Sequence, residues 1–137
     1  KVAGRKEGIM PDRPKDINLF FVLSDSKTTP IKVARNYAEA IGTKFRRLLE
    51  GQGHKVSTFI VTAEELDRAR TGSYEVTHVF FLSHNQLPLA EQIAGRRMKW
   101  RITVLTGGRA HGIVDVMDKT LFGSVSDKSL LDFLTNN

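Results

Sequence analysis

Apolar runs of strand length alternate with stretches of helical periodicity along this chain, and this alternation limits the folds open to it. Residues 17–23 form a nearly continuous apolar run. Such a run is typical of a strand buried on both faces, as in a parallel sheet covered by helices. From Ile31 to Leu48 the apolar residues recur at steps of three and four, which predicts one face of a long helix. Gly51 and Gly53 are expected to end that helix.

The same alternation continues to the end of the chain. Further strands are expected at 54–61, 76–82 and 100–105, with a fifth at either 113–117 or 120–125. Further helices are expected at 62–70, opened by a capping box of Thr62 and Glu65, at 87–94, and after Ser126, which caps the last helix. This order predicts an α/β three-layer sandwich, with a mostly parallel or mixed sheet of 4–5 strands and helices on both faces.

Length and composition indicate one globular domain over residues 17–137, preceded by an irregular basic leader at 1–16. A chain of 137 residues has the usual size of one domain. Hydrophobic residues make up 40% of it, too many for a disordered chain. Residues 1–15 contain no apolar segment like that of a signal peptide. We therefore expect an intracellular protein without membrane insertion, and its compartment and oligomeric state stay open.

The absence of cysteine excludes several kinds of chemistry. Without Cys the chain forms no disulfide, no zinc finger, no iron–sulfur site and no thiol nucleophile. The four histidines share no metal-ligand spacing. His84 and His111 fall in loops and are candidate bases, but neither belongs to a nucleophile motif. We expect no catalytic residue, no metal and no cofactor, and a binding module rather than an enzyme.

The positive charge of the chain predicts an anionic partner. The formal net charge is +6, which favours RNA or an acidic protein. The densest basic cluster holds four cations within six residues and no acid, as a phosphate-backbone contact would. With one cation from each of two loops, the predicted nucleic-acid-binding residues are Lys27, Arg96, Arg97, Lys99, Arg101 and Arg109. Alternatively, these cations are solvated helix ends, where positive charge suits the C-terminal dipole. That second explanation is the favoured one for Lys44, Arg46 and Arg47 on the long helix.

The polar loop at 24–29 is a second candidate site. It joins the first strand to the N-terminus of the long helix, and ligands of open α/β sheets bind beyond the carboxyl ends of strands. The loop contains no glycine, so it matches neither the P-loop nor the dinucleotide fingerprint. Its hydroxyl groups are either ordinary helix caps or ligands of an anion. The candidate anion-binding residues are Ser24, Ser26, Thr28 and Thr29.

The order of elements is similar to that of one family over roughly residues 17–134. An apolar strand at 19–23 precedes a long helix with alanines at 34–40, and an apolar strand follows at 79–82. A Val-Ser pair followed by spaced leucines closes the chain at 125–134. In these features the sequence resembles the anticodon-binding domain of class II aminoacyl-tRNA synthetases. The resemblance implies a small α/β module that binds RNA or docks a protein without catalysis.

Three hypotheses follow. The first is a non-catalytic RNA- or protein-binding module of anticodon-binding-like architecture. The second is a flavodoxin-like domain that binds a phosphate-bearing ligand such as FMN on the hydroxyl groups of the loop at 24–29. The third is a scaffold domain that only docks another protein, with the basic residues serving solubility.

Overall fold

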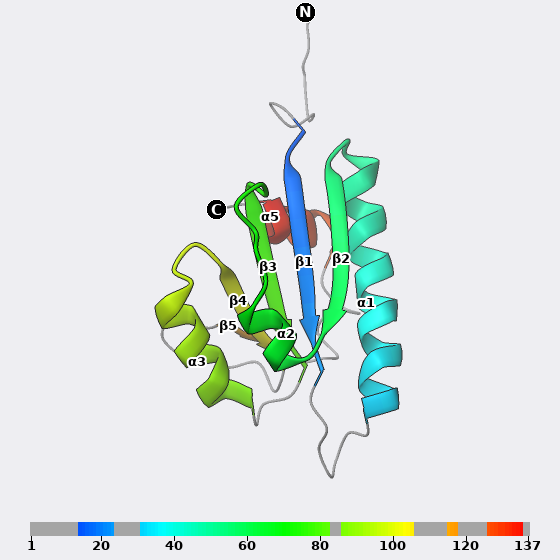
Figure 1. Cartoon of the computed structure of the whole chain (residues 1–137). Coiled ribbons are helices and arrows are strands. Elements are labelled where there is room, and N and C mark those ends of the chain that lie inside the picture. The colour runs from blue at the N-terminus through cyan, green and yellow to red at the C-terminus, as the bar shows by residue number, and fades with distance from the viewer. Residues whose placement is uncertain (1–13, 24–30, 83–85, 106–114, 118–125, 136–137) are drawn as a thin grey trace, which may run out of the picture.

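The computed structural model of the chain describes residues 14–23, 31–82, 86–105, 115–117 and 126–135. Its strands form one sheet in the order β2-β1-β3-β4-β5, and every pairing is parallel. The strands are β1 (Asp16–Val22), β2 (Lys55–Val61), β3 (Val76–Phe81), β4 (Arg101–Leu105) and β5 (Asp115–Met117). The helices are α1 (Ile31–Gly51), α2 (Ala63–Asp67), α3 (Leu87–Arg96) and α5 (Asp127–Thr135) (Figure 1). The predicted α/β sandwich is confirmed, and the fifth strand forms in the first of its two predicted ranges.

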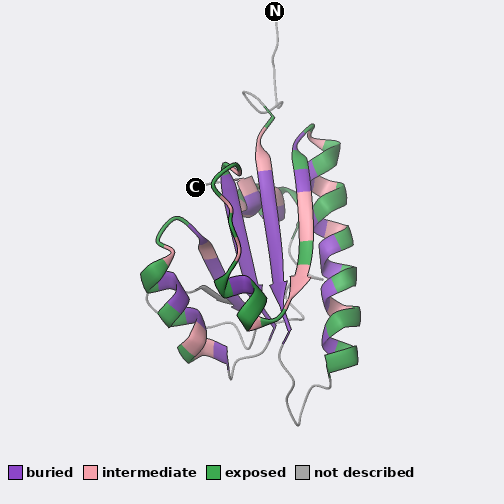
Figure 2. Cartoon of the chain, viewed as in Figure 1, coloured by how far each residue is buried: buried purple, intermediate pink, exposed green. Residues whose placement is uncertain are grey.

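Two hydrophobic cores lie on the two faces of the sheet. Because side chains alternate along a strand, β1 sends Leu19 and Phe21 to one face and Phe20 and Val22 to the other. Helices α1 and α5 cover the first face, and α2 and α3 cover the second. We call these the α1/α5 face and the α2/α3 face. Strands β1 and β3 are therefore buried along nearly their whole length, which explains their continuous apolar sequences (Figure 2).

Aromatic rings hold α1 against the sheet. The ring of Phe45 lies 6.5 Å from that of Phe21 and 5.4 Å from that of Phe80, centroid to centroid. Phe21 and Phe80 stack on each other at 5.2 Å. Gly42 allows this close approach, because a Cβ at that position would lie 3.3 Å from the Phe21 ring. A glycine within the helix thus lets α1 pack closely on the Phe21 ring.

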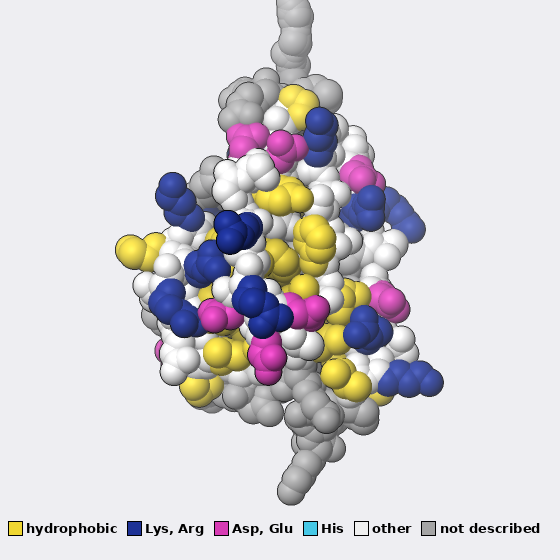
Figure 3. Space-filling view, in the orientation of Figure 1, with side chains coloured by type: hydrophobic (Ala, Val, Ile, Leu, Met, Phe, Trp, Pro, Cys, Tyr) yellow, Lys and Arg dark blue, Asp and Glu magenta, His cyan; other side chains and the backbone are white. Residues whose placement is uncertain are grey.

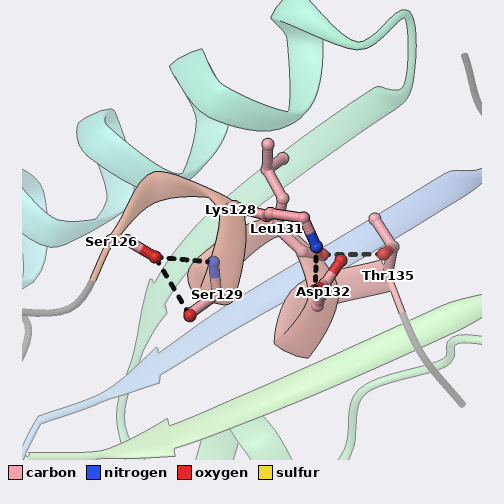
Figure 4. Close-up of polar contacts among 6 residues, drawn as sticks. All are labelled: Ser126, Lys128, Ser129, Leu131, Asp132 and Thr135. Atoms are coloured by element: carbon pink, nitrogen blue, oxygen red, sulfur yellow. Dashed lines mark hydrogen bonds and ion pairs between the residues drawn. The ribbon is translucent and has the colours of Figure 1, made fainter. Parts of the chain in front are cut away.

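The ends of the helices follow the predicted local signals. Thr62 Oγ1 accepts a hydrogen bond from the Glu65 amide, and the Glu65 side chain accepts one from the Thr62 amide, so the capping box is confirmed. Ser126 Oγ accepts a hydrogen bond from the Ser129 amide at 3.1 Å, which caps α5 (Figure 4). Gly53 follows α1 with a φ of 90°, a conformation that favours glycine. Helix α2 ends at Asp67 and not at Arg70 as expected, because the amides of Arg68 and Ala69 close tight i to i−3 turns.

The parallel arrangement gives the sheet an amino edge and a carboxyl edge. The helix-to-strand connections before β3 and β4 lie at the amino edge, at residues 68–75 and 97–100. Strands β1, β3 and β4 end at the carboxyl edge, and residues 24–30, 83–85 and 106–114 after them lie outside the described residues. The amino edge is therefore where the structure shows how neighbouring connections meet.

A buried histidine links the last helix to the sheet. His78 of β3 is fully buried on the α1/α5 face, and its Nε2 lies 2.9 Å from the carbonyl oxygen of Leu134. Its ring stacks on Phe80 at 5.8 Å. Burial lowers the pKa of His78 to about 4, so the ring is neutral and Nε2–H donates to Leu134. Helix α5 is thus held by a hydrogen bond from an imidazole ring that burial keeps uncharged.

We expect the free energy of unfolding to decrease as the pH falls from 6.5 towards 4. In this pH range the unfolded chain binds a proton at His78 and the folded chain does not. The reason is that the pKa of His78 is 6.5 in the unfolded chain and about 4 in the folded one. The stabilisation is complete above pH 6.5, and the loss reaches roughly 3 kcal/mol at the acid end. Denaturant titrations of the wild type and of His78→Asn at several pH values measure it.

The difference between the two proteins isolates His78. The pKa of His54 is also lowered, mainly by burial and then by Lys15, but His54 is present in both proteins. The stability of the His78→Asn variant should depend less on pH, since asparagine does not titrate. Parallel stability curves for the two proteins would show that His78 is not the group responsible.

Candidate nucleic-acid interface

A cleft of about 750 Å³ lies at the amino edge of the sheet, between the connection before β3 and the connection before β4. We call it the basic cleft, because five of its ten lining residues are cations. The first connection contributes Arg68, Ala69, Arg70, Thr71 and Gly72, and the end of α3 with the second connection contributes Arg96, Arg97, Met98, Lys99 and Trp100.

Trp100 joins the two sides of the basic cleft. It is 8% exposed, and its indole Nε1–H donates a hydrogen bond to Thr71 Oγ1 at 2.9 Å. The guanidinium of Arg97 lies over the indole, 4.6 Å from the ring centre, in cation–π geometry. Trp100 packs in the core of the α2/α3 face, and this packing also fixes the direction of Arg97.

One acidic residue, Asp67 at the end of α2, borders the cleft. Arg96 Nη2 lies 2.9 Å from Asp67 Oδ1, and Arg97 Nη2 donates to the Asp67 carbonyl oxygen at 2.9 Å. The Arg96–Asp67 pair is more than half exposed on both sides, so its contribution to stability is small. Arg97, which follows α3, thus bonds the last carbonyl of another helix, α2, where a positive charge suits the helix dipole.

The other three cations of the cleft do not bind Asp67. Arg68, Arg70 and Lys99 are exposed, and within the described ranges their side chains have no hydrogen-bond or ion-pair partner. Arg68 is close enough to Glu65 to help lower the pKa of that carboxyl, after the two Thr62 hydrogen bonds that dominate the shift. These three side chains give the cleft its available positive charge.

The structure brings together three of the six predicted nucleic-acid-binding residues. Arg96, Arg97 and Lys99 line the basic cleft. Arg101 does not, although it is close in sequence: Ile102 packs in the core of the α2/α3 face, so Arg101 leaves from the other face. Accordingly, its charge is among the causes that lower the pKa of buried His78 on the α1/α5 face.

The other candidates lie outside the described residues. They are Lys27, Arg109, Ser24, Ser26, Thr28, Thr29, His84 and His111. Strands β1 and β4, which precede the two loop cations in the sequence, end at the carboxyl edge, opposite to the basic cleft.

Sequence reasoning missed the contribution of the connection before β3. Arg68 and Arg70 directly follow the predicted capping-box helix, and Thr71 follows them. The element order did contain a signal for it. The connections that precede two neighbouring parallel strands both arrive at the same edge of the sheet, so their side chains lie close together. Considering both connections together would have added Arg68 and Arg70 to the basic cluster.

The chemistry of the cleft suits the binding of an anion. Its lining contains no His, Asp or Glu that would act as a general acid or base. Among the residues that the structure describes, no group of three His, Cys, Asp or Glu side chains is placed to hold a metal ion. None of the described helices is both long enough and apolar enough to cross a membrane.

No protein-family model, curated protein or solved structure matches the chain. The function is therefore inferred from the basic cleft and from the sheet beside it.

Replacing Thr71 with valine should lower the free energy of unfolding by about 1 kcal/mol, because the Trp100 indole N–H loses its acceptor. Trp100 is the only tryptophan of the chain, so its fluorescence emission reports the change directly. Thr71→Ser keeps the acceptor and should retain the wild-type emission and stability. Identical emission and unfolding midpoints in all three proteins would argue against this link between the two connections.

Proposed function

We propose that this chain is a non-catalytic binding module that binds RNA through the basic cleft. The observation that carries the proposal is the gathering of five cations around one cleft, three of them exposed and unengaged within the described part of the chain. Contacts of Lys and Arg with phosphates supply most of the sequence-independent affinity of proteins for nucleic acids. The net charge of +6 adds a long-range attraction for a polyanion.

An acidic protein is the competing partner, and two features favour RNA. Four of the five cleft cations are arginines, whose planar guanidinium groups match phosphate geometry and stack on aromatic rings. Aromatic side chains also lie on the sheet face next to the cleft, as is typical of RNA-binding surfaces. The resemblance to anticodon-binding domains stays a prediction, and it implies the same class of ligand.

Neutralising the three exposed cations should weaken RNA binding and reduce its dependence on salt. In the variant with Arg68→Gln, Arg70→Gln and Lys99→Gln, the plot of log affinity against log salt concentration should become less steep by roughly 2. Each lost phosphate contact with a single strand reduces the magnitude of the slope by about 0.7. Titration of a labelled RNA at several salt concentrations measures the slope.

The matched control carries Lys32→Gln, Arg46→Gln and Arg47→Gln on α1. It loses the same charge from exposed positions on the helix that packs on the opposite sheet face. Its affinity and salt slope should stay close to those of the wild type. Equal losses in the two variants would mean that net charge, and not the basic cleft, governs binding. Absence of any salt-dependent RNA affinity in the wild type would overturn the proposal.

A second candidate function is favoured by the order of the strands. The parallel order β2-β1-β3-β4-β5 is that of flavodoxin-like folds, which hold their ligand beyond the carboxyl ends of β1 and β3, where the strand order reverses. In this alternative a phosphate-bearing ligand such as FMN binds Ser24, Ser26, Thr28 and Thr29. The support is the likeness of topology, since these four residues lie outside the described ones.

The alternative predicts that FMN raises the melting temperature of the protein. A ligand at about 100 times its Kd adds about 2.7 kcal/mol to the free energy of unfolding. Replacing Ser24 and Ser26 with alanine should reduce the shift, while the Arg68, Arg70 and Lys99 variant should keep it. A melting temperature that does not respond to FMN would remove this candidate.

A further inference from the structure

The α2/α3 face of the sheet is covered over only part of its area. Helix α2 has five residues and contributes one buried side chain, Leu66. Strand β2 lies at the edge of the sheet, and most of its residues are partly or fully exposed, unlike those of β1 and β3 (Figure 2). On this face, Phe59 in the middle of β2 remains 41% exposed. A large apolar ring is thus presented to solvent from a regular strand.

Phe59 and Tyr74 form an aromatic patch on this face. The Phe59 ring lies 5.4 Å from the ring of Phe20, its register partner on the neighbouring strand β1, which packs beside it. Tyr74 is partly buried, and its hydroxyl donates a hydrogen bond to Ser57 Oγ of β2 at 3.3 Å. Both rings are therefore positioned by the sheet before any ligand is present.

The aromatic patch adjoins the basic cleft. Phe20, which supports Phe59, also contacts Trp100 in the cleft, with ring centroids 6.0 Å apart. Tyr74 lies on the connection that lines the cleft, and its amide donates to the carbonyl oxygen of Thr71. Figure 3 shows this arrangement: hydrophobic surface lies in the middle of this face, with Lys and Arg side chains along the flank near α3.

We propose that the aromatic patch stacks with unpaired bases, so that the RNA held by the basic cleft is single-stranded. This inference rests on the proposed function. Bases within an A-form duplex are stacked on each other and leave no free ring face for a protein side chain. A cationic groove that follows the backbone, beside aromatic rings that receive bases, is the combination used for single strands, and it tolerates any sequence.

A membrane surface is the competing anionic partner. Met98 is 86% exposed among the cations of the cleft, as a side chain that inserts between lipid headgroups would be. Lipid binding would depend on Met98 and the cations and would leave Phe59 without a role. The two partners therefore require different side chains.

Three ligands of equal length test the inference on the full chain. They are an oligouridine of about ten nucleotides, an abasic oligomer of the same length, and an RNA duplex of that length. The oligouridine should bind about tenfold more tightly than either of the others at the same salt concentration. The Phe59→Ala variant should lose roughly tenfold in affinity for the oligouridine and should bind the abasic oligomer as the wild type does.

Control variants separate stacking from apolar contact and from misfolding. Phe59→Tyr keeps an aromatic ring and should keep the affinity, whereas Phe59→Leu keeps apolar volume and should lose it. Val33→Ala removes an exposed apolar side chain from α1, which is 54% exposed, and should have no effect on RNA binding. Thermal unfolding of each variant shows whether its fold is retained.

The outcomes distinguish this inference from the proposed function. Equal binding of all three ligands, with no effect of Phe59→Ala, would overturn the stacking role while the effect of the cleft variant still supports RNA binding. Loss of salt-dependent affinity for every nucleic acid would overturn the proposed function itself. Tighter binding to vesicles rich in phosphatidylserine, reduced by Met98→Ser and unaffected by Phe59→Ala, would replace the single strand with a lipid surface.

Discussion

Parallel pairing of β1 with both β2 and β3 is the constraint on which the rest of the structure depends. All seven residues of β1 pair in register with β2, and Ile17 to Val22 also pair with β3. A parallel pair requires a crossover. The connections before β2, β3 and β4 each place a helix on a face of the sheet and bring the chain back to the amino edge, where the next strand begins. The basic cleft exists because two such returns, before β3 and before β4, lie side by side at the amino edge.

The same geometry divides the cations of this edge into those bonded within the fold and those left exposed. Helix α3 ends at the amino edge with Arg96 in its last turn, and Arg96 and Arg97 both bind Asp67 at the end of α2. These two arginines tie the ends of two helices together and offset the negative charge that gathers there. Arg68, Arg70 and Lys99 remain exposed, and none of them has a hydrogen-bond or ion-pair partner in the part of the chain that the structure describes.

Local signals in the sequence were sufficient for the elements but not for the site. The capping box of Thr62 and Glu65 and the apolar run at 17–23 are read within a few residues, and both are confirmed. The pairing of Arg96 with Asp67 spans 29 residues and depends on the order of the strands, which no local pattern specifies. The separation of Arg101 from the cleft was within reach of sequence reasoning, because strand alternation beside Ile102 already places it on the opposite face.

The exposure of Phe59 also follows from the length of α2. Because that helix ends at Asp67, it packs on the sheet only through Ala63 and Leu66 among its hydrophobic side chains, and the edge strand keeps a ring in solvent. An exposed ring on an edge strand favours association with other strands. The net charge of +6 opposes such association between copies of the same chain, because like charges repel. The same charge attracts a polyanion. Under the proposed function the same charge both opposes self-association and attracts RNA, so raising the salt concentration should weaken RNA binding and favour self-association together.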